Sequence, residues 1–353
     1  MLRRKRNGCA LVTGGAGFVG SHLAELLLAD GYEVVAFDNL STGRLDNLEQ
    51  VIDDPRFELV VGDVGDEALL AQVVRGCDVV FHLAAAVGVK LILAEPLQSL
   101  KTNLGGTESV LRAAFARRTP VLIASTSEVY GKVARIPQRE DDDVLLGSTR
   151  YCRWSYAASK MLDEFFGLAY ARQGLPVVIF RLFNTVGPRQ TGRYGMVLPR
   201  FVGAALRDEP LEVHGDGMQT RCFVHVRDAV EALHRLARTP EAAGEIFNVG
   251  STESVSILEL ARRVLGEVSE SRLRDGLEPP AEELIRFIPY EVAYPGGEFE
   301  DIRARRPDIS KIRRATRWRP KQSLTDTVRD VVAHEEAVTA VHADELLGEY
   351  APA

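Results

Sequence analysis

The sequence predicts an α/β fold: a Rossmann-type doubly wound parallel sheet with a smaller, discontinuous substrate-binding lobe. Short β-branched runs alternate with longer helical patterns through the first half of the 353 residues, which is the pattern of successive βαβ units. A glycine-rich loop follows the first of these runs, and the alternation becomes irregular past Asn184. A chain of this length falls between one large α/β domain and two closely joined lobes.

The elements of the first half follow from the spacing of the apolar residues. Two long stretches, 97–117 and 154–173, have the periodicity of amphipathic helices. The short runs between turns predict parallel strands at 9–13, 33–37, 57–61, 78–82, 121–124 and 177–180.

The second half is predicted to leave the sheet and return to it. Turns are expected at Gly187-Pro188 and Gly215-Asp216-Gly217, with returning strands at 223–224 and 246–247. Residues 267–283 are polar and contain prolines, and 298–306 are dense in charge, so both are predicted surface loops, one of them a candidate cover over the site. The expected division is a nucleotide-binding domain at 7–183 with returning segments near 222–249, a substrate-binding lobe at 184–221 and 250–320, and a C-terminal helix and tail at 321–353.

Composition argues against several classes of protein. A net charge of −7 and a pI of about 5.6 provide no basic face for nucleic acid. The basic residues 2–6 run directly into the first strand without a separate apolar leader, and no stretch is long enough to span a bilayer. Cys9, Cys77, Cys152 and Cys222 lack CxxC spacing, so neither a metal site nor a disulfide framework is expected. The expectation is a protein of the reducing cytoplasm.

The glycine loop predicts a dinucleotide site. Gly15-Ala16-Gly17-Phe18-Val19-Gly20 satisfies GxGxxG, follows a strand and opens a helix from Ser21 onward. Because glycine has no Cβ, backbone amides and the helix N-terminus can approach a pyrophosphate. Asp38 follows the second strand, where its carboxylate accepts hydrogen bonds from an adenosine ribose and repels a 2′-phosphate, so NAD is expected rather than NADP.

Two further strand ends are expected at the same edge of the sheet. Gly62-Asp63-Val64 would place a carboxylate near the adenine, and Leu83-Ala84-Ala85-Ala86 would place small residues under the cofactor. Asp63 is equally consistent with a helix cap.

A candidate catalytic pair follows in the next long helix. Tyr156 and Lys160 are four residues apart and share a helix face, so the ammonium is expected to lower the pKa of the phenol toward the working pH. Tyr156 is then a candidate acid or base for a sugar or alcohol hydroxyl. Ser125-Thr126-Ser127-Glu128-Val129-Tyr130-Gly131 ends another strand at the same edge and offers hydroxyls to the same oxygen. Such a cluster alone is more often a turn or cap.

With these residues in place, the chain resembles the extended short-chain dehydrogenase/reductase family of nucleotide-sugar epimerases, dehydratases and decarboxylases over nearly its whole length. Within that family the likeness is greatest to UDP-glucuronate decarboxylases. The stretches that carry it are 38–44, 100–103, 125–131, Arg153, 183–189 and 305–309.

The resemblance implies roles for individual residues. Tyr156 is the implied base, Lys160 its electrostatic partner and ribose ligand, and Thr126 or Ser127 a hydroxyl relay. The implied NAD contacts are Gly14, Gly17, Phe18, Val19, Asp38, Asn39, Ser41, Thr42, Gly43, Asp63, Val64, Leu83, Ala84, Ala85, Thr102, Ser125, Tyr156 and Lys160. The implied contacts to a UDP-sugar are Val87, Lys101, Glu128, Arg153, Asn184, Val197, Leu198, Arg221 and Arg305.

The chemistry of a uronic acid supports decarboxylation as the first hypothesis. Oxidation at C4 leaves a ketone β to the C6 carboxylate, and such an acid loses carbon dioxide readily. The enzyme must then bind the carboxylate and protonate C5, tasks that suit Glu128 and Arg305, because a guanidinium donates two parallel hydrogen bonds to a carboxylate. The predicted reaction converts UDP-glucuronate to UDP-xylose or its 4-keto form. Plain surface charges at Arg153 and Arg305, and a structural acceptor at Glu128, are the alternatives.

Other hypotheses stay open at this stage. Ala157-Ala158-Ser159 and residues 84–89 are similar to epimerases, so C4 epimerisation of a UDP-hexose or UDP-glucuronate is the second hypothesis. Dehydratases of the family carry Asp-Glu where this chain has Ser127-Glu128, which places 4,6-dehydration third. A nucleotide-binding regulator without catalysis would not need an activated phenol. The resemblance also implies a homodimer through a four-helix bundle of the two long helices, whose apolar faces could equally belong to the core.

Overall fold

A seven-stranded parallel sheet forms the larger part of the molecule. The computed structural model describes residues 8–88, 92, 94–193, 195–294 and 300–348; the predicted basic opening at 2–6 lies outside them. The strands are ordered β11-β6-β5-β4-β1-β2-β3, and every neighbouring pair is parallel. They are β1 (Cys9–Thr13), β2 (Glu33–Asp38), β3 (Phe57–Val61), β4 (Val79–His82), β5 (Val121–Thr126), β6 (Val177–Leu182) and β11 (Ile246–Val249). The predicted doubly wound sheet is confirmed, and the six predicted strands of the first half shift by at most two residues.

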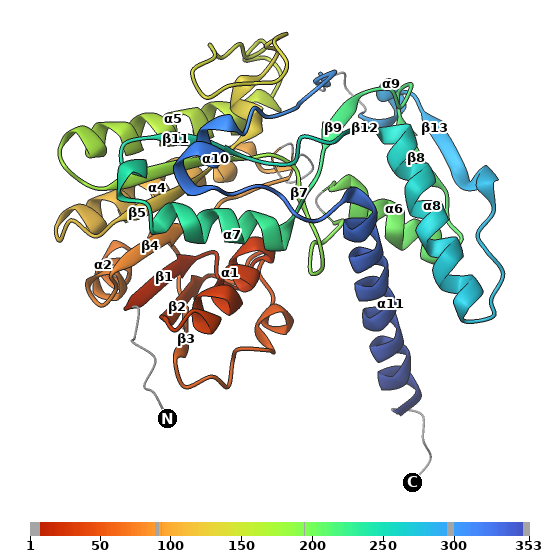
Figure 1. Cartoon of the computed structure of the whole chain (residues 1–353), viewed down its shortest axis with the longest axis horizontal. Coiled ribbons are helices and arrows are strands. Elements are labelled where there is room, and N and C mark those ends of the chain that lie inside the picture. Colours follow the sequence, from red (N-terminus) through yellow and green to blue (C-terminus); the bar gives the residue numbers. More distant parts are fainter. Residues whose placement is uncertain (1–7, 89–91, 93, 194, 295–299, 349–353) are drawn as a thin grey trace.

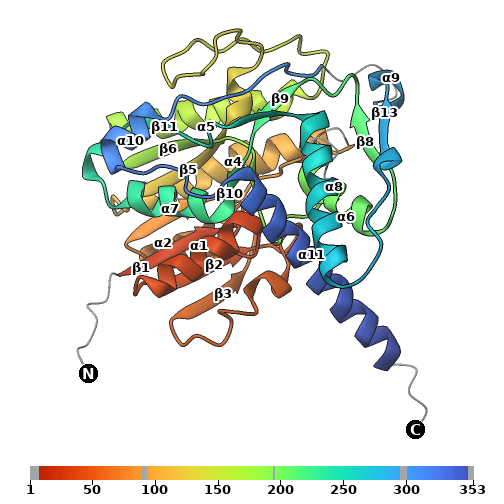
Figure 2. The ribbon, with the colours of Figure 1, turned by 45° about the vertical axis from the view of Figure 1, so that its right-hand side comes forward.

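Helices cover both faces of this sheet (Figures 1 and 2). Successive residues of a strand point to opposite faces, so Val12 packs with the cluster that holds α1 and α7, while Leu11 packs with the cluster that holds α2, α4 and α5. Both faces are therefore apolar and buried, as in other parallel sheets. The helices are α1 (Phe18–Ala29), α2 (Glu67–Arg75), α4 (Pro96–Phe115), α5 (Trp154–Arg172), α7 (Val226–Ala237) and α10 (Ser310–Thr316). Short 3-10 helices are η1 (Leu45–Leu48), η2 (Ser127–Tyr130), η3 (Pro240–Ala242) and η4 (Glu282–Leu284).

A smaller lobe lies beside the carboxyl edge of the sheet and has its own core (Figure 1). Its helices are α6 (Val197–Leu206), α8 (Ile257–Arg274), α9 (Tyr290–Ala293) and α11 (Leu324–Gly348). Its strands form three pairs, β7 (Thr185–Val186) with β10 (Val224–His225), β9 (Thr220–Cys222) with β12 (Ser254–Ser256), and β8 (Leu211–His214) with β13 (Ile285–Ile288). Leu198, Leu260 and Val328, from α6, α8 and α11, pack together in this core. Within the part of the chain that the structure describes, no helix combines the length and apolarity needed to cross a bilayer.

Three sequence predictions for the second half are wrong in detail. Residues 223–224 do not rejoin the sheet, because β10 pairs with β7 outside it, and only β11 returns beside β6. Residues 267–274 are the last turns of α8, whose apolar face packs into the lobe. The described part of 298–306 is a loop, but only part of it is at the surface: Arg303 is exposed, whereas Ile302 and Arg305 are buried where the segment passes the candidate site.

Candidate active site

The glycine loop is tightly enclosed where β1 meets α1. Gly14 has φ +71°, and a Cβ there would lie 2.9 Å from the backbone nitrogen of Ala84. A Cβ on Gly20 would lie 2.1 Å from the Gly14 carbonyl oxygen. The helix begins at Phe18 with Gly17 as its N-cap, and no side chain caps its first turn. The N–H groups of that turn therefore have the arrangement that binds a phosphate.

Asp38 lies beside this loop at the end of β2. One carboxylate oxygen accepts the N–H of Ala16 at 3.0 Å, and the other accepts the N–H of Leu40 at 2.8 Å. Burial raises the pKa of Asp38, and these two N–H groups act against that rise. A carboxylate offers about four acceptor positions, so acceptor capacity remains for ribose hydroxyls. Together with the uncapped helix and the enclosed glycines, Asp38 fits a bound dinucleotide.

Asp63 does not cap the following helix. Its carboxylate accepts hydrogen bonds from the Asn39 side chain at 2.7 Å and from the N–H of Gly65 at 2.8 Å. The cap of α2 is Asp66, which accepts the N–H of Leu69. The helix-cap alternative for Asp63 is therefore wrong, and its carboxylate holds Asn39 at the edge where the adenosine is expected.

Tyr156 and Lys160 lie on the buried side of α5, but their expected electrostatic relationship is not the one observed. Burial raises the pKa of Tyr156, the carboxylates of Glu128 and Asp163 raise it further, and the Thr126 hydroxyl acts in the opposite direction. Lys160 Nζ donates to Asp163 Oδ2 at 2.7 Å, and both side chains are almost completely buried. The prediction that Lys160 lowers the pKa of Tyr156 is wrong for this arrangement, because a carboxylate neutralises the ammonium at contact distance.

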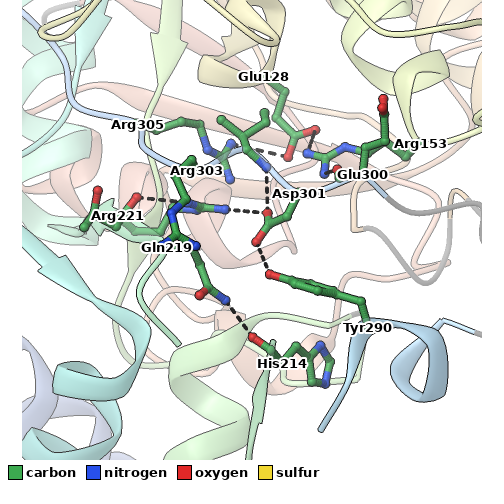
Figure 3. A network of polar contacts seen from close by, with 12 residues as sticks. Glu128, Arg153, His214, Gln219, Arg221, Tyr290, Glu300, Asp301, Arg303 and Arg305 are labelled. Atoms are coloured by element: carbon green, nitrogen blue, oxygen red, sulfur yellow. Dashed lines mark hydrogen bonds and ion pairs between the residues drawn. The ribbon is translucent and has the colours of Figure 1, made fainter. Parts of the chain in front are cut away.

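Glu128 lies between two arginines that come from distant parts of the chain (Figure 3). Its carboxylate is 3.6 Å from Arg153 Nη2 and 3.4 Å from Arg305 Nη1. Burial would raise the pKa of Glu128, but Arg153, Arg305 and Arg221 more than offset this effect and hold it below its ordinary value. Glu128 is therefore ionised at neutral pH. The same Arg305 nitrogen lies 3.3 Å from the Ser127 hydroxyl.

A second ion pair adjoins the first. Arg221 Nη2 donates to Asp301 Oδ1 at 2.8 Å, and Tyr290 donates its hydroxyl proton to the other oxygen of Asp301 (Figure 3). The sequence analysis does not identify Asp301 or Tyr290. Both are recognised through the pair of Arg221 with Asp301, which are 80 residues apart in the chain.

The whole cluster carries an excess of positive charge. Arg153, Arg221 and Arg305 supply three guanidinium groups, and Glu128 and Asp301 supply two carboxylates. Burial lowers the pKa of Arg305 to about 10, with repulsion from Arg221 and Arg153 acting in the same direction. The Nε atom of Arg305 is buried and has no hydrogen-bond partner among the described residues. A buried donor in a positively charged cluster favours an anionic ligand.

A cleft of about 390 Å³ brings most of the predicted residues together. Lys101 and Thr102 on α4 are outside its lining, and Val64 packs into the apolar core on the α2 side of the sheet. Ala84, the loop glycines and the adenosine-side residues also lie outside the lining, namely Gly14, Gly17, Asp38, Asn39, Ser41, Thr42, Gly43 and Asp63. The predicted residues that line it are Phe18, Val19, Leu83, Ala85, Val87, Ser125, Thr126, Ser127, Glu128, Arg153, Tyr156, Lys160, Asn184, Val197, Leu198, Arg221 and Arg305.

Comparison with known proteins gives consistent results. A family model described as GDP-mannose 4,6 dehydratase matches residues 11–331. A UDP-N-acetyl-alpha-D-glucosaminuronate decarboxylase of Bacillus cytotoxicus is 41% identical over 323 residues, which are 91% of this chain and 96% of the relative. UDP-glucuronic acid decarboxylase 1 of Arabidopsis thaliana is 36% identical, over 92% of this chain and 68% of that protein. The structure of DesIV, a dTDP-glucose 4,6-dehydratase of Streptomyces venezuelae with NAD and TYD bound, has a TM-score of 0.81 and 30% identity, covering 94% of this chain and 98% of that one.

Proposed function

Because this chain belongs to the GDP-mannose 4,6-dehydratase family of extended short-chain dehydrogenases/reductases, we propose that it is an NAD-dependent decarboxylase of a UDP-uronic acid. The predicted reaction converts UDP-glucuronate to UDP-xylose or its 4-keto form. The single observation that carries the proposal is the buried Glu128 between Arg153 and Arg305, with its excess of positive charge and the unpartnered Arg305 Nε. A hydroxyl of a neutral hexose could accept from that donor, but only an anionic group would also balance the excess positive charge.

The cofactor proposal rests on the loop and strand ends described above. Gly14, Gly17 and the first turn of α1 would hold the pyrophosphate, Asp38 the adenosine ribose, and Lys160 the nicotinamide ribose. When bound, NAD supplies the two-electron acceptor for oxidation at C4 of the sugar.

Tyr156 is the proposed base for the C4 hydroxyl. The Thr126 hydroxyl favours the ionised form of the Tyr156 phenol, and both residues line the cleft. Removing the hydroxyl proton while C4 is oxidised forms the ketone, and the bond between C5 and the carboxylate carbon then breaks with its electron pair delocalised onto the ketone oxygen. A protonated Tyr156 beside that oxygen is placed to donate the same proton to it.

The arginines are proposed to bind the substrate carboxylate in competition with Glu128. Glu128 is an ionised neighbour of both guanidinium groups, so it weakens their hold on a second carboxylate. That unfavourable proximity is relieved when neutral carbon dioxide leaves, which lowers the barrier. Arg305, with a pKa lowered to about 10, is the proposed proton donor to C5. The enol proton returns to Tyr156 in the same step, which leaves the neutral 4-keto pentose, and Arg305 regains its proton from solvent.

The substrates for which the relatives are named differ in the substituent at C2 of the sugar. One is named for an N-acetylglucosaminuronate and another for a glucuronate, and both carry the C6 carboxylate on which this proposal depends. UDP-glucuronate is the first substrate to test and the N-acetylated uronate the second.

C4 epimerisation of a UDP-uronate is the second candidate, since the same arginines would hold a carboxylate that is never lost. Product analysis with substrate labelled at C6 separates the two reactions. A catalytically silent regulator is tested by Tyr156→Phe, which should abolish turnover while leaving NAD binding intact. Full biological activity of that variant would favour the regulator.

A homodimer in the cytoplasm is also proposed. Its support is a set of exposed apolar side chains on the adjacent helices α4 and α5, with Leu97, Leu162 and Phe165 at 65%, 42% and 62% exposure. Exposed apolar residues gathered on one surface are typical of interfaces. The division into domains at 7–183, 184–221 with 250–320, and 321–353 stays a prediction. The two separate cores support two lobes, but Ile312 and Trp318 belong to the core of the sheet and Leu324 and Val328 to the core of the smaller lobe.

A further inference from the structure

Lys160 and Asp163 form a buried ion pair within a single turn of α5. The Nζ–Oδ2 distance is 2.7 Å, and the side chains are 2% and 0% exposed. Residues three apart on a helix are neighbours, so the sequence contained this signal. A charge removed from water needs a partner of opposite charge. Asp163 is that partner for Lys160 and therefore belongs to the surroundings of the proposed base, Tyr156.

Asp163 is also linked to the strand below the site. Burial raises the pKa of Asp163, and the Lys160 ammonium and the Thr107 hydroxyl of α4 act in the opposite direction. Asp163 Oδ1 is buried and has no hydrogen-bond partner among the described residues, so Lys160 is the contact that compensates this carboxylate. Thr107 Oγ1 lies 3.1 Å from His82 Nε2. His82 Nδ1 in turn lies 2.8 Å from the Thr13 hydroxyl, directly before the glycine loop. Burial lowers the pKa of His82 to about 3, and the Lys160 charge acts in the same direction. His82 is therefore neutral, and Asp163 is the group that compensates Lys160.

The charged groups around the Tyr156 phenol come from several elements. Glu128 of η2 and Asp163 of α5 oppose its ionisation. Lys160 is paired with Asp163, and Glu164, also on α5, is paired with Arg181 of β6. His82 of β4 is neutral. Arg153 and Arg305 contact Glu128 directly, and Arg221 is paired with Asp301. Lys160 follows Tyr156 by four residues and shares its helix face, and the Asp163 carboxylate contacts the Lys160 ammonium at 2.7 Å.

We propose that Asp163 is a positioning residue that fixes the Lys160 ammonium and keeps Tyr156 protonated until cofactor and substrate are in place. An ammonium has three N–H donors, and Asp163 accepts one of them, so two remain for the ribose hydroxyls of the cofactor. Asp163 thus fixes the position of the Lys160 side chain along α5 and reduces the effect of the Lys160 charge on the Tyr156 phenol. This inference rests on the proposed function only in taking Tyr156 as the base.

The test is a titration of the phenol itself. A fluorinated tyrosine, whose phenol is more acidic than that of tyrosine, is incorporated at position 156, and its ¹⁹F shift is followed against pH in protein without NAD or sugar. Asp163→Asn should lower the apparent pKa of the label by about one unit or more, because it removes a carboxylate that raises the pKa of Tyr156 and leaves the Lys160 ammonium uncompensated on the same helix face. Asp163→Glu should titrate like the parent protein.

A matched control removes the neighbouring buried carboxylate. Glu164→Gln breaks the pair with Arg181, whose guanidinium lies 2.8 Å from Glu164, and should leave the label's pKa unchanged. Asp163→Ser serves if Asp163→Asn does not fold, as judged by circular dichroism. An unchanged titration in the folded Asp163→Asn or Asp163→Ser protein would overturn the inference, and so would an equal shift in Glu164→Gln. Because the titration involves no turnover, it stands or fails independently of which sugar reaction the protein catalyses.

Discussion

Arg305 Nη1 lies 3.4 Å from Glu128 Oε1 although the two residues are 177 positions apart in the sequence. Glu128 is at the end of a central strand of the sheet, and Arg305 is on the segment that returns from the smaller lobe. The contact joins the two lobes at the place where the substrate carboxylate is proposed to bind. The predictions below follow from this relationship and from the groups around it.

Replacing Glu128 with Gln should slow decarboxylation by at least about a hundredfold while lowering KM. The neutral amide no longer competes for Arg153 and Arg305, so the substrate carboxylate binds more tightly and gains less when carbon dioxide leaves. Steady-state kinetics with UDP-glucuronate measures both effects. Glu253→Gln is the matched control, since Glu253 pairs with Arg263 at a more exposed position and its change should leave the kinetics unaltered. An equal loss in a C4-epimerase assay would count against the decarboxylase assignment.

Replacing Arg305 with Lys should reduce kcat/KM by about a hundredfold, because lysine keeps the charge but not the planar fork or the buried Nε donor. Arg303→Lys controls for the substitution itself, since Arg303 is exposed two residues earlier and pairs with Asp216. The same decrease in both variants would remove Arg305 from the proposed site.

Acid should destabilise the protein below about pH 6.5 through its buried histidines. Burial lowers the pKa of His22 to about 4, so the unfolded chain binds a proton that the folded protein does not. The stability held above the unfolded pKa is therefore lost as the pH falls from about 6.5 toward 4, by about 2 kcal/mol at pH 5 for this group. Urea unfolding at pH 7 and pH 5 measures the loss. His22→Gln, whose amide can still donate to the Pro188 carbonyl that His22 contacts at 3.0 Å, should lose correspondingly less; an identical loss would contradict the assignment.

Replacing Phe165 with Asp should convert the proposed dimer to a monomer, because a charge at the centre of an apolar interface is costly to bury. Light scattering at micromolar concentration gives the mass directly. Leu273→Asp is the control, since Leu273 is 61% exposed but on α8, away from α4 and α5, and it should remain dimeric. A parent protein that is already monomeric would reject the dimer itself.

Most of the fold is predictable from patterns of residues that are close together in the sequence. The strand and helix patterns of the first half, the glycine loop and Asp38 are each set by residues close in sequence, and their positions were predicted to within a few residues. The departures arose where tertiary packing decides: residues 223–224 pair with β7 instead of the sheet, and residues 267–274 extend α8 against the lobe.

The candidate site is likewise predictable from the sequence only in part. Tyr156, Lys160 and residues 125–128 come from one helix and one strand end, so their meeting was predictable from topology. The partners that set their protonation were not: burial governs the pKa of Tyr156, and the Arg221–Asp301 pair depends on the path of a segment that the sequence indicated only as charged. The position of Asp163 is accessible from helix spacing, but the sequence analysis relates Lys160 to Tyr156 and to the cofactor ribose and not to Asp163.

The most direct test of the central claim is to incubate the purified protein with NAD and UDP-glucuronate uniformly labelled with carbon-13, and to follow the sugar by NMR while released bicarbonate is trapped. The proposal predicts labelled bicarbonate in equal amount to a UDP-pentose or its 4-keto form. The same test with the N-acetylated uronate covers the alternative substituent at C2. Full retention of C6 with both uronates, together with an inverted C4, would contradict decarboxylation and make the protein an epimerase.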